Sequence, residues 1–226
     1  MSEFLNIDCM EGMKTFPDKH FDLAICDPPY GLNMEVNAYN NGINCKANGF
    51  KAHLKKEWDN AIPKEDYFNE LFRVSKNQII TGANYFTKYL PPTMAWIFWY
   101  KMQDNFSFSD GEFIFTSFQT KAKIFQYARG NESGFSPKSP FNSANIHPTQ
   151  KPIALYKWLL KNYAKEGDLI LDTHVGSASS LIACEDMGFE YVGYELDKDY
   201  YDAAQKRLKE FRSQLKFNYS ELADAK

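Results

Sequence analysis

The sequence predicts an α/β fold built on a mostly parallel, twisted sheet with an antiparallel hairpin at one edge. Two short apolar runs, residues 4–8 and 21–26, flank a short helical stretch, which is the pattern of a βαβ start. A second strand–helix–strand unit covers residues 169–195. The hairpin is predicted from two aromatic, β-rich segments, residues 94–100 and 112–118.

The remaining elements follow from local signals. Pro152 suits the first turn of a helix, and Gly188 suits the residue that ends one. Apolar spacing predicts helices over residues 64–75, 152–164, 178–187 and 198–211, and a strand over residues 78–81. Residues 121–127 follow the hairpin closely, so we expect them to pair antiparallel to it.

Length and composition favour one compact domain. The chain has 226 residues and is 44% hydrophobic, which supports a sizeable core. We expect residues 1–226 to form a single domain with two inserted segments, at about 31–57 and 101–146, where apolar periodicity is lost and lysines gather. The net charge of −3 argues against a protein that coats nucleic acid nonspecifically, but a local basic groove is compatible with it.

Targeting and metal signals are missing from the sequence. The N-terminus has no basic segment followed by an apolar one, and no apolar run approaches the length of a membrane span. The four cysteines are scattered without a C-x-x-C pair, so neither a zinc site nor a disulfide framework is indicated. We therefore expect a cytoplasmic protein without a membrane partner and without a metal.

The sharpest motif is Asp27-Pro28-Pro29-Tyr30, directly after the apolar run 21–26. Open α/β sheets bind ligands beyond the carboxyl ends of their strands, which is where this motif falls. The Asp27 carboxylate and the Pro28 carbonyl provide two hydrogen-bond acceptors, and Tyr30 provides an aromatic ring. Two acceptors for the two protons of a nucleobase amine would make its nitrogen more nucleophilic, while the ring stacks on the flipped base. The alternative interpretation is a simple surface turn.

A glycine-containing turn follows the strand at residues 169–172. Gly176 lets the backbone approach a ligand closely, and Glu195, at the end of the next strand, is placed to bind ribose hydroxyls. Because no phosphate-binding fingerprint is present, a nucleoside cofactor without phosphates is favoured over NAD or ATP.

The segment His147-Pro148-Thr149-Gln150-Lys151-Pro152 leads into a predicted helix. Thr149 and Lys151 could contact a carboxylate at that helix N-terminus, where backbone N–H groups are unpaired. The alternative is a plain helix start.

With these three motifs in this order, the chain resembles the β class of amino-methylating DNA methyltransferases, over about residues 4–210. The resemblance implies a Rossmann-like methyltransferase fold with circularly permuted motif order, S-adenosylmethionine as cofactor and DNA, double-stranded, as substrate. It also implies a possible homodimer. The catalytic motif would be Asp27, Pro28, Pro29 and Tyr30. The cofactor contacts implied are Asp8, Cys9, His147, Thr149, Lys151, Asp172, His174, Gly176, Ser177 and Glu195.

The cofactor loop departs from the family form D-P-F-x-G-S-G-T. Here Thr173 and His174 replace its Pro-Phe pair, and Ala178 replaces a glycine, which puts the cofactor affinity and the role of His174 in question. In this family Ser in place of Asp27 would indicate cytosine N4, so Asp27 favours adenine N6. The alternatives left open are cytosine N4 methylation, methylation of an RNA base amine, and a nucleic-acid-binding module that has lost turnover.

Overall fold

The computed structural model describes residues 2–32, 61–103, 109–128 and 150–224, with backbone only for 215–224. The inserted segments predicted at 31–57 and 101–146 therefore lie largely outside the described residues. Every helix among these residues is too short or too polar to cross a bilayer.

Eight strands form one sheet in the order β1-β8-β7-β2-β3-β5-β4-β6. Neighbours from β1 to β3 are parallel, β5 is antiparallel to both β3 and β4, and β6 is parallel to β4. The bounds are β1 Glu3–Leu5, β2 Phe21–Cys26, β3 Ser75–Thr81, β4 Ile97–Tyr100, β5 Gly111–Thr116, β6 Lys123–Gln126, β7 Leu169–Asp172 and β8 Glu190–Tyr194.

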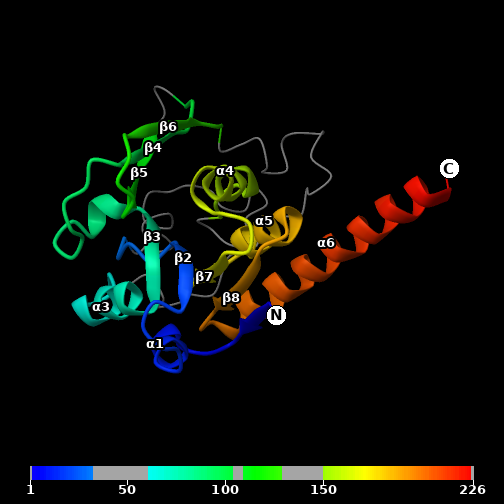
Figure 1. Ribbon diagram of the computed structural model, residues 1–226, viewed down its shortest axis with the longest axis horizontal. Coiled ribbons are helices and arrows are strands. Elements are labelled where there is room, and N and C mark those ends of the chain that lie inside the picture. The colour runs from blue at the N-terminus through cyan, green and yellow to red at the C-terminus, as the bar shows by residue number, and fades with distance from the viewer. Residues whose placement is uncertain (1, 33–60, 104–108, 129–149, 225–226) are drawn as a thin grey trace, which may run out of the picture.

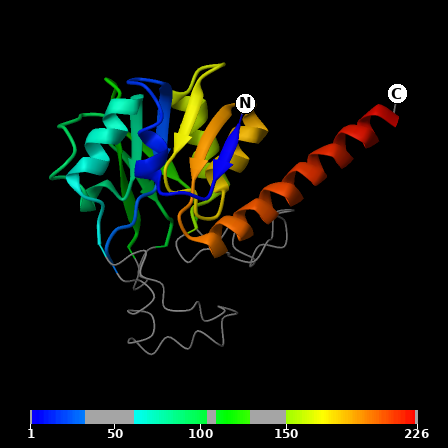
Figure 2. The same cartoon turned by 90° about the horizontal axis from the view of Figure 1, so that it is seen from below.

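Helices cover both faces of the sheet (Figure 1). They are α1 Cys9–Met13, α3 Glu65–Val74, α4 Ile153–Tyr163, α5 Ser179–Met187 and α6 Lys198–Asp224, with a 3-10 turn, η1, at Ala83–Tyr85. One core packs α1 and α3 against the sheet around Phe68 and Leu71. The other packs α4, α5 and the first half of α6 around Leu159 and Leu181. The rest of α6 extends away from the sheet (Figure 2).

The order of the strands in the sheet confirms the predicted permutation of the motifs. The chain runs from β7 through α5 to β8, and the strand beyond β8 is the N-terminal β1, with Leu5 opposite Tyr194. The N-terminal strand β1 therefore lies at the edge of the half of the sheet that the C-terminal strands β7 and β8 form. On the other side of β7 lies β2, with Leu171 opposite Ala24. The sheet changes direction of growth between β7 and β2, which is where open α/β sheets bind ligands.

Two expectations about strands were wrong. Segment β6 does not extend the hairpin in antiparallel fashion, because β5 already has β3 on one side and β4 on the other, so β6 pairs with the free edge of β4 and runs parallel to it. Strand β1 also ends earlier than predicted. Asp8 lies beyond it and caps α1, accepting a hydrogen bond of 2.7 Å from the backbone N–H of Met10.

Candidate active site

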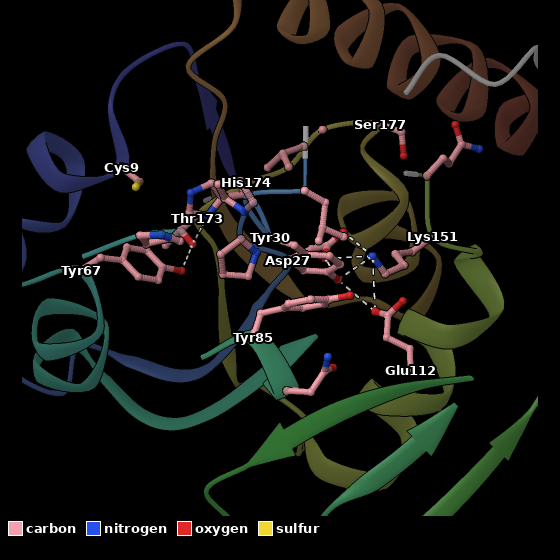
Figure 3. A pocket seen from close by; sticks show the side chains of 18 of the residues that line it. Cys9, Asp27, Tyr30, Tyr67, Tyr85, Glu112, Lys151, Thr173, His174 and Ser177 are labelled. Carbon is pink, nitrogen blue, oxygen red and sulfur yellow. Dashed lines mark hydrogen bonds and ion pairs between the residues drawn. The ribbon is translucent and has the colours of Figure 1, made fainter. Parts of the chain in front are cut away.

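One pocket of about 1460 Å³ opens at the carboxyl ends of β1, β8, β7 and β2. It gathers most of the predicted site residues although they come from opposite ends of the chain (Figure 3). Those that line it are Asp8, Cys9, Asp27, Pro28, Pro29, Tyr30, Lys151, His174, Gly176, Ser177 and Glu195. His147 and Thr149 lie outside the described residues.

The Asp27 carboxylate is held by three side chains. Its Oδ1 accepts hydrogen bonds from Thr81 and from the Tyr30 hydroxyl at 2.6 Å, and Lys151 Nζ lies 2.9 Å from Oδ1 and 2.8 Å from Oδ2. Burial alone would raise the pKa of Asp27, but the Lys151 ammonium and these hydrogen bonds lower it below its ordinary value. Asp27 is therefore a carboxylate at neutral pH and a hydrogen-bond acceptor.

Lys151 does not point to the helix N-terminus that the sequence indicated. Its ammonium lies between Asp27 and Glu112 of β5, at 3.5 Å from Glu112 Oε1, and its side chain is 5% exposed. Burial would lower the pKa of Lys151, but the two carboxylates raise it. The lysine thus stays charged and joins two acids at the centre of the pocket.

Tyr30 carries two kinds of contact. Its ring stacks on Tyr85 with centroids 5.0 Å apart and an angle of 17°, and its hydroxyl lies 3.0 Å from Glu112 Oε1. Gly82 makes room for this ring, because a Cβ atom there would lie 2.2 Å from it. Tyr85 therefore covers one face of the Tyr30 ring.

The turn after β7 is built by hydrogen bonds from its own residues. Asp172 is buried outside the pocket lining, where its carboxylate accepts from the His174 N–H at 3.0 Å and from Ser180. Burial raises the pKa of Asp172 to about 7. Glu195 accepts from the Gly176 N–H at 2.9 Å. Asp172 therefore supports the turn on the side away from the pocket, while Glu195 lies on the side that faces the pocket.

The two departures at the start of the turn contact each other and α3. Thr173 Oγ1 lies 2.9 Å from His174 Nδ1 and 2.7 Å from the Tyr67 hydroxyl. Burial lowers the pKa of His174 to about 4, so the imidazole is neutral. Ala178, at the glycine position of the family, has φ +62° and is the N-cap residue of α5. The turn is kept despite the substitutions, with a methyl group in the left-handed region.

Three contributors were missed by the sequence reasoning. Thr81, Tyr85 and Glu112 come from β3, η1 and β5, which bear none of the motifs. Glu112 carried one usable signal, since an acidic residue within an aromatic β segment needs a partner when it is buried.

The chain is similar to known methylases in sequence and in fold. The profile of the DNA methylase family N6_N4_Mtase matches residues 76–206, more than half of the chain. The putative methylase YubD of Escherichia coli is 27% identical, covering 92% of this chain and 90% of that protein. Type II methyltransferase M.HpaI of Haemophilus parainfluenzae is 25% identical, covering 89% and 72%. The crystal structure of an M1.HpyAVI-SAM complex has a similar fold, with TM-score 0.57, 19% identity and coverage of 92% and 99%.

These findings agree with the architecture of the sheet and its helices. The similar solved structure confirms the predicted methyltransferase fold, and the family match extends across β3 to α6. The protein belongs to the N6_N4_Mtase family of DNA methylases.

Proposed function

We propose that the protein transfers a methyl group from S-adenosylmethionine to the exocyclic N6 of adenine in double-stranded DNA. The observation that carries this proposal is the meeting of Asp27 and Glu195 in one pocket. Asp27 offers a hydrogen-bond acceptor for the amine of the target base. Glu195 offers an acceptor for the cofactor, beside the turn that contains Gly176. Relatives named as Type II methyltransferases support DNA as the substrate.

The charge of the pocket fits this cofactor. Among the described residues, seven carboxylates and three lysines line the pocket. An acidic lining favours a ligand that bears a sulfonium and an ammonium, and it disfavours a polyphosphate. Gln150 Oε1 is buried without a hydrogen-bond partner among the described residues, and it is an acceptor that suits the ammonium.

Different residues of the chain are assigned to different parts of the cofactor. We assign Glu195 to the ribose hydroxyls, Gly176 and Ser177 to the close approach of the turn, and Asp8 with Cys9 to the adenine end. Thr149 remains assigned to the methionine carboxylate, and His147 remains a cofactor contact by resemblance alone. The bound cofactor supplies a methyl group that is already activated, so the protein's main task is to position the amine and to stabilise charge. No metal is required for this transfer.

Asp27 performs the central task. Its carboxylate and the Pro28 carbonyl accept hydrogen bonds from the two amine N–H groups, which orients the lone pair and stabilises the positive charge that develops on nitrogen. Tyr30 and Tyr85 form an aromatic platform for the base once it leaves the stack. Asp at the first position of the motif, where Ser would indicate cytosine N4, favours adenine. His174, neutral at the turn, adds no charge to compete with the sulfonium.

The test is transfer from methyl-labelled S-adenosylmethionine to unmethylated double-stranded DNA, single-stranded DNA and RNA, with the nucleosides digested and identified. We expect N6-methyladenine from double-stranded DNA. N4-methylcytosine or a methylated RNA nucleoside would replace the proposed target with one of those alternatives. Cofactor binding with no product on any nucleic acid would favour a binding module.

A further inference from the structure

Two carboxylates and two proton carriers form a continuous hydrogen-bonded path in the pocket (Figure 3). Lys151 Nζ lies 2.8 Å from Asp27 Oδ2 and 2.9 Å from the Tyr30 hydroxyl. The hydroxyl in turn lies 3.0 Å from Glu112 Oε1. The path therefore leads from the catalytic motif to a carboxylate on a different strand, which the proposed transfer does not use.

Methylation of an amine must release one proton. As nitrogen attacks the methyl carbon, the N–C bond forms, the C–S bond breaks and the nitrogen becomes cationic until an N–H bond breaks. Oδ1 of Asp27 already accepts from Tyr30, Thr81 and Lys151, whereas Oδ2 contacts only Lys151 among the described residues. Oδ2 is therefore the oxygen with room to take the amine proton.

We propose that Glu112 is the terminal acceptor of this proton, and that Lys151 and Tyr30 carry it from Asp27 to Glu112. The inference rests on the proposed methyl transfer and adds the step that returns Asp27 to a carboxylate before the next turnover.

The step balances over four groups. Protonated Asp27 passes its proton to Lys151 Nζ as Lys151 gives one to the Tyr30 oxygen, and the Tyr30 proton moves to Glu112 Oε1. Lys151 ends as an ammonium and Tyr30 as a neutral phenol. The proton has moved from one carboxylate to the other, and Glu112 then releases it to solvent. Amine and methylsulfonium have become methylamine, thioether and a free proton.

The Lys151 ammonium acts on both ends of the path, because it contacts both carboxylates. The Lys151 ammonium opposes the effect of burial and lowers the pKa of Asp27, so Asp27 does not retain the proton. Once Asp27 is neutral, the Tyr30 hydroxyl has its charged acceptor at Glu112, which favours a hydrogen bond there. The groups that face Glu112 are Lys101 at 3.4 Å, Lys151, Tyr30 and, more distantly, Tyr156 of α4.

The experiment compares the first turnover with later turnovers by rapid quench, using the wild-type protein, Glu112→Gln and Tyr30→Phe. In Glu112→Gln we expect a burst of one methyl group per protein at nearly the wild-type rate, followed by a steady-state rate lower by at least about tenfold. Tyr30→Phe should lower the steady-state rate because it interrupts the path, and it should also slow the first turnover because the Tyr30 hydroxyl holds Asp27. The control Glu166→Gln alters an exposed residue outside the pocket and should behave as wild type.

Rescue separates proton transfer from packing. Formate should restore steady-state turnover to Glu112→Ala by replacing the lost carboxylate, and should leave the wild-type rate unchanged. The proposed proton path is wrong if formate has no effect on Glu112→Ala, or if Glu112→Gln slows the first turnover as much as later ones. Absence of methyl transfer by the wild-type protein in the same assay would instead remove the proposed function, and the proton path with it.

Discussion

The ammonium of Lys151 lies 2.8 Å from Oδ2 of Asp27, although 124 positions separate the two residues in the chain. The contact links the segment before α4 to the loop after β2 and keeps the pKa of Asp27 low against the effect of burial. A segment expected to serve only the cofactor therefore controls the charge of the Asp27 carboxylate.

Removal of that cation should shift the pH dependence of methyl transfer. In Lys151→Met the buried Asp27 loses its main stabilising charge, so its pKa rises. Because Asp27 must be ionised to accept a hydrogen bond from the amine, the acidic limb of kcat/KM should move to higher pH. Lys157→Met, which removes an exposed partner of Asp186, is the matched control. An acidic limb at the wild-type position would contradict this role of Lys151.

Gly82→Ala should disturb Tyr30 directly. Gly82 has φ +61°, and an added Cβ would lie 2.2 Å from the Tyr30 ring. We expect a loss of about 1–3 kcal/mol in unfolding free energy from backbone strain and steric clash, together with a large loss of turnover, because the Tyr30 hydroxyl leaves Asp27. Denaturant unfolding and initial rates measure the two effects.

Gly188→Ala is the control for the strain alone. Gly188 has φ +78°, but a Cβ there would meet nothing within 4 Å. It should lose about 1–2 kcal/mol of stability and keep its turnover below the unfolding temperature. Equal losses of turnover in the two variants would show that the contact of Gly82 with Tyr30 is unimportant.

His174→Phe should remove part of the acid sensitivity of the fold. Burial lowers the pKa of folded His174 to about 4 from 6.5, so between these pH values the unfolded chain binds a proton that the folded chain does not. The unfolding free energy of the wild type therefore rises with pH from 4 to 6.5. The difference between wild type and variant should grow by roughly 2 kcal/mol over that range.

Denaturant titrations at several pH values measure this difference. Burial of Asp172 has the opposite effect, since its raised pKa of about 7 makes the folded chain bind the extra proton. Asp172 is present in both proteins, so its slope cancels in the comparison. A difference independent of pH would mean that His174 is protonated equally in the folded and unfolded states.

Arg207→Met should weaken cofactor binding without slowing transfer. The buried Arg207 of α6 donates to the Ser177 carbonyl at 2.7 Å and to Ser179 Oγ at 3.0 Å, on either side of Ala178. Loss of this support should raise the cofactor Kd by about tenfold and leave kcat at saturating cofactor near wild type. Calorimetry and saturation kinetics separate the two effects.

Arg212→Met is the matched control, because Arg212 is half-exposed and binds Glu185 on the far end of α5. Arg212→Met should leave the cofactor Kd and kcat unchanged. A lower kcat with unaltered Kd in Arg207→Met would contradict the proposed support of the turn.

The sequence predicted the parts of this protein that depend on local signals. The apolar run before Asp27, the Gly188 cap and the apolar spacing of α4 each act over a few residues, and each lies as predicted. Asp27 and Glu195 were placed together because parallel strands end at a common edge.

The rest depends on long-range pairing that no local pattern contains. Glu112 reaches Tyr30 only because β5 inserts between β3 and β4, an arrangement that also reverses the predicted direction of β6. The orientation of Lys151 was missed for a related reason, since its partner Asp27 lies 124 positions away in the chain. Local signals located the motifs, and strand order decided which other side chains joined them.

The most direct test compares Asp27→Asn with Glu195→Gln, measuring cofactor Kd and kcat for DNA methylation in both. We expect Asp27→Asn to lower kcat by about 10²–10³-fold while binding the cofactor nearly as wild type. Glu195→Gln should raise the cofactor Kd by about tenfold or more and retain kcat at saturation. If both variants lost affinity and turnover in equal measure, the assignment of Asp27 to the target amine and Glu195 to the cofactor would be wrong.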